Sequence, residues 1–145
     1  MPSPLAAPLK SKIFQDIKNS KNAQALKKAK LGVKKFPKDP DFWSMAGFVL
    51  QSEKQYKKSV QFFLGAVKLR PRDEKDIENL ATALEMSNQT STAEKYLRQT
   101  LNRHPDILQV YVLLGNLLAR QERWHDLVRL ATTSLEIFPE DVEFL

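Results

Sequence analysis

The stretch from residue 37 to residue 71, PKDPDFWSMAGFVLQSEKQYKKSVQFFLGAVKLRP, decides the fold of this chain. Apolar and small residues recur at intervals of three and four from Trp43 to Leu50, which is the spacing of one face of an α-helix. Polar residues interrupt this pattern at 52–54, and a second helical stripe runs from Tyr56 to Val67. Neither helix can bury its stripe alone, so the stretch predicts two antiparallel helices packed as a hairpin.

The prolines that bound this stretch belong to a series with a fixed period. Successive members lie 34 residues apart, at Pro37, Pro71, Pro105 and Pro139. Each follows an apolar periodic segment, and because proline cannot continue a helix, each predicts a helix end. An aspartate follows soon after the first three prolines, and we expect Asp39, Asp73 and Asp106 to cap the next helix.

Three stretches of the chain match one another column by column at this period. Their matching residues are Trp43, Ala46, Gly47, Leu50, Phe63 and Pro71, then Ile77, Leu80, Ala81, Leu84, Leu97 and Pro105, then Tyr111, Leu114, Gly115, Leu118, Ala131 and Pro139. The pattern closely resembles the tetratricopeptide repeat, whose 34-residue signature reads W-x2-L-G-x2-Y, then A-x3-F, then P. The small residue at Gly47, Ala81 and Gly115 is expected where the two helices of a unit cross closely.

This resemblance implies an all-α fold, a right-handed α-solenoid of antiparallel helix hairpins in one domain. We predict full units over 40–73, 74–107 and 108–141, and the start of a further unit over 142–145. The unit over 6–39 is divergent, because Lys12, Ile13 and Asp16 replace the alanine or leucine, the small residue and the leucine of the other units. We expect its first helix to pack differently, as terminal repeats often do.

Composition excludes several classes of protein. The chain has 145 residues, 42% of them hydrophobic, and no cysteine, so it holds no disulfide, thiolate zinc site or cysteine nucleophile. It shows neither a secretory signal nor a span of membrane length, so we expect a cytoplasmic protein without a membrane partner. The formal charge of +6 is uneven, because residues 1–75 carry 17 Lys and Arg against 6 Asp and Glu.

Motifs of catalysis are missing from the sequence. The only histidines, His104 and His125, are not spaced as metal ligands on a helix, and no phosphate-binding glycine loop or nucleophile elbow occurs. We therefore expect no enzyme, no cofactor and no metal, and we look for function in a surface.

The resemblance implies that the first helix of each unit lines a concave groove that binds a protein or peptide. The candidate groove residues are Lys10, Phe14, Ser44, Phe48, Lys75, Asn79, Thr82, Met86, Val112, Asn116 and Arg120. Exposed phenylalanines at 14 and 48 would mark a partner site, although they could instead cover the edge of the core.

A subclass of the family grips a C-terminal carboxylate with Lys and Asn, then Asn, then Lys and Arg from three successive first helices. The corresponding positions here hold Ser44, Phe48, Asn79, Gln109 and Leu113, or, one unit earlier, Lys10, Phe14, Met45, Lys75 and Asn79. Too few residues match, so no carboxylate clamp is expected.

Three further interpretations stay open. The lysines of the first half, mostly on second helices, could bind nucleic acid, but arginines and stacking aromatics are missing among them. The chain could be the N-terminal docking arm of a larger enzyme, such as a glycosyl- or sulfotransferase. Residues 140–145, EDVEFL, look like the opening of another unit, so the C-terminal end could also pair with a second copy as a homo-oligomer.

Overall fold

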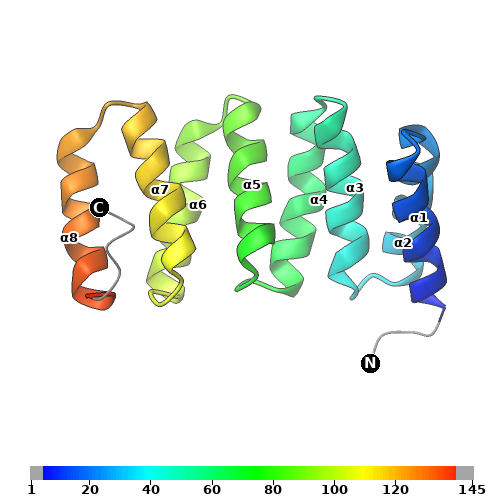
Figure 1. Ribbon diagram of the computed structural model, residues 1–145, viewed down its shortest axis with the longest axis horizontal. Helices are drawn as coiled ribbons and strands as arrows, with labels where there is room; N and C mark the ends of the chain where they lie inside the picture. The colour runs from blue at the N-terminus through cyan, green and yellow to red at the C-terminus, as the bar shows by residue number, and fades with distance from the viewer. Residues whose placement is uncertain (1–4, 140–145) are drawn as a thin grey trace.

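The computed structural model describes residues 5–139, which form eight α-helices and no strand (Figure 1). This all-α helical-repeat solenoid confirms the predicted fold class. The helices are α1 (Ala6–Lys18), α2 (Asn22–Lys35), α3 (Pro40–Ser52), α4 (Tyr56–Leu69), α5 (Glu74–Met86), α6 (Thr90–Arg103), α7 (Leu108–Arg120) and α8 (Trp124–Ile137).

The helices form two rows. The first helices α1, α3, α5 and α7 stand side by side, and the second helices α2, α4, α6 and α8 form the other row (Figure 1). Within the first row α1 contacts α3 and α5 contacts α7, whereas the second helices pack chiefly on first helices. We call the exposed surface of the first row the first-helix face.

Two of the three expected aspartate caps are confirmed. The side chain of Asp39 accepts a hydrogen bond from the Asp41 amide at 3.0 Å, and that of Asp73 accepts one from the Asp76 amide at 2.9 Å. The prediction for Asp106 is wrong. The N-cap residue of α7 is Ile107, and no side chain makes a capping hydrogen bond there. Asp106 follows its proline by one residue instead of two, so it lies too early in the turn.

Each hairpin turns through one residue with positive φ. These residues are Ser20, Lys54, Asn88 and Glu122, which lie 34 residues apart with φ between 58° and 62°. The amide that follows each of them donates to the carbonyl five residues earlier, as Gln55 does to Leu50 at 2.8 Å. This is the Schellman arrangement, which ends a helix and reverses the chain in a fixed geometry.

The helices of a hairpin cross most closely where a small residue faces a large one. A Cβ atom on Gly47 would lie 2.6 Å from the Phe63 ring, so the expectation that a small residue is required there is confirmed. In the first hairpin the sizes are reversed, since Ile13 stands at the position of Gly47 and Ala29 at that of Phe63, and both are fully buried.

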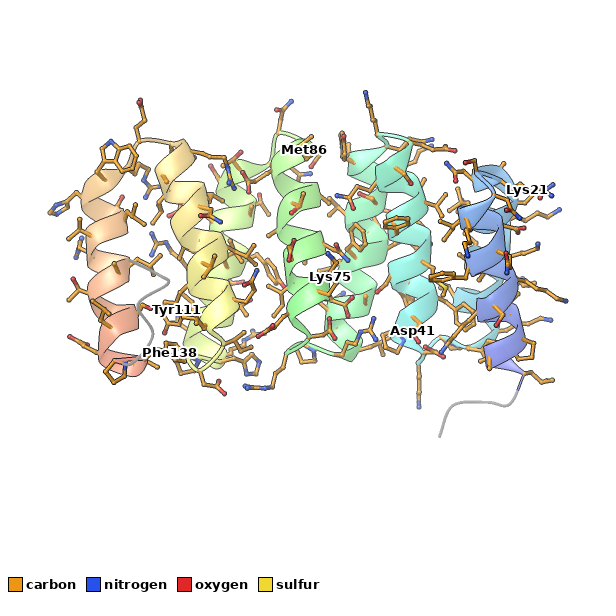
Figure 2. All side chains as sticks on the ribbon, viewed as in Figure 1. Lys21, Asp41, Lys75, Met86, Tyr111 and Phe138 are labelled. Atoms are coloured by element: carbon orange, nitrogen blue, oxygen red, sulfur yellow. The ribbon has the colours of Figure 1, made fainter. Side chains whose placement is uncertain are left out.

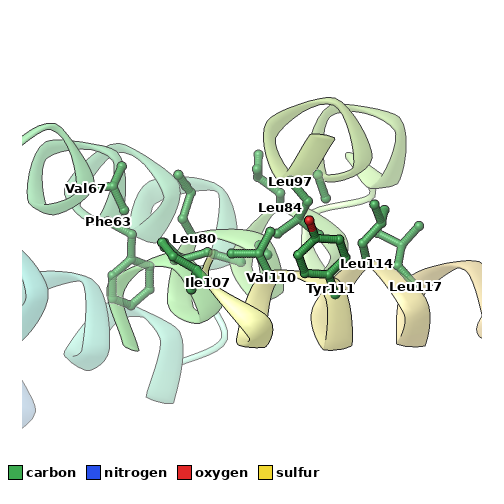
Figure 3. Close-up of a cluster of buried hydrophobic side chains, with 14 of the residues drawn as sticks. Phe63, Val67, Leu80, Leu84, Leu97, Ile107, Val110, Tyr111, Leu114 and Leu117 are labelled. Atoms are coloured by element: carbon green, nitrogen blue, oxygen red, sulfur yellow. The ribbon is translucent and has the colours of Figure 1, made fainter. Parts of the chain in front are cut away.

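One buried core extends from the second helix of the second hairpin to the last hairpin. Side chains from α4 to α8, among them Phe63, Leu80, Leu97 and Leu114, form one buried cluster (Figure 3). A second cluster joins α1, α2 and α3 around Ile13 and Phe42. The first hairpin also differs at Asp16, which is buried and pairs with Lys28 at 2.5 Å where the other units have a buried leucine.

The reversed size pair predicts a compensating double substitution. Gly47→Ile should destabilise the fold by about 1–3 kcal/mol or more through overpacking, and Phe63→Ala by about 3–5 kcal/mol through a cavity. The double variant reproduces the Ile13 and Ala29 pair, so urea unfolding should show a loss smaller than the sum by about 1 kcal/mol or more. Additive losses would contradict the assigned crossing.

Candidate functional site

All eleven candidate groove residues lie on first helices. Exposed side chains are those of Phe14, Phe48, Lys75, Met86, Asn116 and Arg120, and half-buried ones are those of Lys10, Ser44, Asn79, Thr82 and Val112. Figure 2 shows Asp41, Lys75 and Met86 along this row. Their use in binding stays a prediction, and the contacts of each side chain decide how available it is.

Two aromatic rings dominate the first-helix face. Phe14 of α1 is 66% exposed and Phe48 of α3 is 51% exposed, and the two residues occupy the same position in successive units. Neither ring stacks on another aromatic residue of the described chain, since the ring pairs there involve other residues. These rings therefore neither complete the core nor cover each other, which is the condition expected of a docking site.

Met86 extends the apolar part of the face to α5. Its side chain is exposed and lines a cavity of about 300 Å³ beside the turn between α3 and α4, together with Gln55 and Tyr56. A thioether adapts its shape to irregular apolar partners, so this position suits contact with a ligand side chain.

A network of charged residues runs across the other end of the first helices. Lys10 lies 2.7 Å from Asp39 and donates a hydrogen bond of 2.8 Å to Asp41. Asp41 in turn accepts a hydrogen bond of 2.9 Å from Arg70 at the end of α4. Arg70 also donates to Asp76, whose second oxygen accepts a bond of 2.8 Å from Ser44.

This network occupies two of the candidate residues. Lys10 is neutralised by two carboxylates and Ser44 donates to Asp76, so neither is free to receive a ligand. Partial burial raises the pKa of Asp41, but the hydrogen bonds from Lys10 and Arg70 outweigh it and hold that pKa below its ordinary value. A carboxylate ligand would have to displace these ionised partners, which supports the expectation that no clamp exists.

Sequence reasoning missed Arg70 and Asp76, although their columns carried the signal. Asp76 is only 1% exposed and stands where the neighbouring units have the buried residues Phe42 and Val110. Arg70 stands where the first unit has Phe36, whose ring stacks on Phe42 at 5.5 Å between centroids. A basic and an acidic residue that replace two apolar ones in the same unit predict a buried ion pair.

The far part of the first-helix face is more polar. Arg120 of α7 donates to Glu85 of α5 at 2.6 Å, which ties neighbouring first helices together. Lys75 lies 4.0 Å from Glu78 on its own helix. Thr82 and Asn116 continue the column of the two phenylalanines, so the face changes from aromatic to polar along the solenoid.

Larger cavities open on the opposite side, between second helices. One of about 680 Å³ lies between α6 and α8 beside Leu101 and Leu130, and another of about 420 Å³ lies between α4 and α6 beside Val67 and Tyr96. Their lining residues correspond at the 34-residue period, so they are crevices left wherever successive second helices diverge. Charged and aromatic side chains do line them, namely Arg98, Asp126, Arg129 and Tyr111 in the larger and Lys68, Arg103, His104 and Tyr96 in the smaller. We assign them no ligand, because the repeated packing of successive second helices explains both.

Residues 5–139 show no constellation for catalysis. No group of three or more His, Cys, Asp or Glu side chains among them could hold a metal ion. His104 contacts Arg72 at 3.2 Å at the end of a helix, and His125 is exposed. Over the same residues no helix has both the length and the apolar character needed to cross a bilayer.

Comparison with solved structures identifies the architecture. MamA from Desulfovibrio magneticus RS-1 superposes with a TM-score of 0.70 at 17% identity, over 95% of this chain and 78% of that one. The chain has the fold of tetratricopeptide repeat proteins. YrrB, described as a tetratricopeptide repeat protein with an unusual peptide-binding site, superposes with a TM-score of 0.68 at 17% identity, over 92% of this chain and 69% of YrrB.

A third similar structure is a tetratricopeptide repeat protein from Parabacteroides merdae, with a TM-score of 0.75 at 14% identity. It covers 96% of this chain, which spans 56% of that protein. No protein-family model and no curated protein sequence matches the chain.

The buried ion pair predicts an asymmetric mutational result. Arg70→Met leaves the Asp76 carboxylate buried without its cation and should lower the free energy of unfolding by about 3 kcal/mol. The double variant Arg70→Met with Asp76→Val restores an apolar junction like that around Val110 and should lie within about 1 kcal/mol of the wild type. Urea unfolding measures both, and a harmless Arg70→Met would refute the assigned pair.

Proposed function

We propose that this chain is a non-catalytic scaffold that binds a protein or peptide through its first-helix face. The observation that carries the proposal is the pair of exposed phenylalanines, Phe14 and Phe48, in one column of that face. Their exposure leaves apolar surface uncovered on a chain whose other large rings are mostly packed, and such surface marks interaction sites. The peptide-binding site ascribed to YrrB, a protein of the same fold, supports this use of the solenoid.

The chemistry of the face defines the ligand. Phe14, Phe48 and Met86 offer apolar contacts, and the polar column beyond them offers hydrogen bonds from Thr82 and Asn116. The occupied state of Lys10 makes a terminal carboxylate a poor anchor at the first helix. We therefore infer a peptide segment with two or more large apolar side chains, which does not depend on a free C-terminus.

The remaining interpretations gain no support from a particular contact. The docking-arm hypothesis concerns a larger enzyme, and no residue described here discriminates it from a free-standing scaffold. The nucleic-acid hypothesis lacks exposed aromatic side chains among the lysines of α2 and α4, where a single strand would need stacking platforms.

Selection of a peptide from a displayed random library would test this proposal. We expect Phe48→Ala to weaken binding of the selected peptide by about 2 kcal/mol. Titration calorimetry should then show a Kd that is roughly thirtyfold higher. The melting temperature should hardly change, because the ring lies outside the core. Leu64→Ala on a second helix is the matched control and should leave Kd unchanged. Equal binding by Phe48→Ala and wild type would sink the proposal.

We also propose that this scaffold self-associates through a second surface, on its last hairpin. Leu127 and Ala131 are only half-buried, whereas the residues 34 positions earlier, Ala93 and Leu97, are fully buried. Leu130 is buried, so the uncovered surface is one flank of α8. That flank carries Trp124, Val128, Ala131 and Leu135 at helical spacing. Residues 140–145, the expected opening of a further unit, lie outside the described residues.

Sedimentation equilibrium tests the self-association. The wild type should show a concentration-dependent monomer–dimer equilibrium, and Val128→Glu should be monomeric because it places a charge in the apolar flank. Thr133→Glu, an exposed position on the other flank of α8 that faces the crevice toward α6, is the control and should dimerise like the wild type. A wild type that stays monomeric at high concentration would refute this surface.

A further inference from the structure

The charge of the molecule is divided between its two faces. Helices α2 and α4 carry eight lysines and no acidic residue. The four first helices α1, α3, α5 and α7 together carry six acidic residues and five basic ones. The eight lysines are Lys27, Lys28, Lys30, Lys34, Lys35, Lys57, Lys58 and Lys68. The uneven charge of the sequence is therefore a difference between faces as well as between halves.

These lysines are almost all available to a partner. Only Lys28 forms an ion pair with a described residue, namely Asp16. The other seven side chains are exposed and have no carboxylate within ion-pair distance among the residues described. Seven unneutralised ammonium groups on two neighbouring second helices produce a strongly positive surface, which we call the α2–α4 basic face.

Leucines stand among the lysines on this face. Leu31 is 42% exposed and follows Lys27 by four residues, and Lys34 follows Leu31 by three, so the three share one stripe of α2. Leu64 is 40% exposed on α4, where it stands at the position of Lys30, between Lys57 and Lys68 in sequence and at the edge of the crevice toward α6. The face thus combines positive charge with protruding aliphatic side chains.

We propose that the α2–α4 basic face binds an anionic lipid surface. Lysine is a compact point charge that suits diffuse attraction to many headgroups, and each contributes about 1 kcal/mol near an anionic leaflet. Exposed leucines can enter the boundary between headgroups and acyl chains. Nucleic acid fits less well, because α2 and α4 hold no arginine and expose no aromatic ring on this face.

Such docking is peripheral and needs no membrane-spanning helix, and none of the helices within residues 5–139 could cross a bilayer. The lysines and leucines meet on one surface only after the second helices are aligned, so composition alone does not reveal the face. Bound in this way, the chain would direct its first-helix face away from the lipid. Peptide binding and lipid binding would then use opposite sides, and either can fail without the other.

Co-sedimentation of the full chain with phosphatidylcholine vesicles, with and without phosphatidylglycerol, tests the proposal. We expect binding only to the anionic vesicles, and weaker binding as salt is added. The variant K27E/K30E/K34E should lose roughly a hundredfold or more in partition coefficient. The control K12E/K18E/K75E changes the net charge by the same amount, but on first helices. Its fold loss in partition coefficient should be less than a tenth of the loss for K27E/K30E/K34E. Far-UV circular dichroism and melting verify that both variants fold.

Two further arms separate lipid from other polyanions. Leu31→Ser with Leu64→Ser should weaken vesicle binding while leaving any binding of single-stranded RNA unchanged. Phe48→Ala should bind vesicles like the wild type. The proposal is overturned if anionic vesicles are not bound, if the two charge variants lose equally, if the leucine variant binds vesicles normally, or if RNA alone is bound through the α2 lysines.

Discussion

The close crossing of the two helices in each hairpin is the contact on which the other features depend. At Gly47 the helices approach until the Phe63 ring lies against the glycine backbone, and the first hairpin reaches the same approach with Ile13 against Ala29. What is kept is the summed size of the pair, since interiors tolerate neither voids nor overlap. This contact fixes the rotation of each first helix about its own axis. The same rotation leaves the side chains of Phe14 and Phe48 exposed.

The junctions between hairpins vary more than the hairpins themselves. The first uses stacked rings, Phe36 on Phe42, and the missing side chain of Gly32 leaves room for the second ring. The next has Ala66 at the position of Gly32, and there the ion pair of Arg70 and Asp76 replaces the rings. This ion pair places charges beside the first-helix face, where Asp41 pairs with Lys10 and Asp76 accepts a hydrogen bond from Ser44. Of the candidate residues there, the column of Phe14 and Phe48 is therefore the part left available to the proposed ligand.

The 34-residue period made the fold predictable from the sequence. The contacts between side chains of different units were not predictable in the same way. The small column at Gly47 and the caps at Asp39 and Asp73 follow from local rules. The cap expected at Asp106 was wrong, because this aspartate lies one position before the N-cap residue Ile107. Of the candidate site, the sequence left open whether Phe14 and Phe48 are exposed or cover the edge of the core, and in the packed helices both are exposed. The engagement of Lys10 was not predicted, because its partners lie 29 and 31 residues away and only the stacked units bring them together.

Site-directed photo-cross-linking tests most directly whether the hairpin crossing orients a binding face. A photoreactive phenylalanine analogue would be placed at Phe14, at Phe48 or, on the opposite row, at Leu64, and each protein would be irradiated with a peptide selected on the wild-type chain. The account predicts peptide adducts from positions 14 and 48 and none above background from position 64. Adducts from position 64 equal to those from position 48, or none from either phenylalanine site, would contradict it.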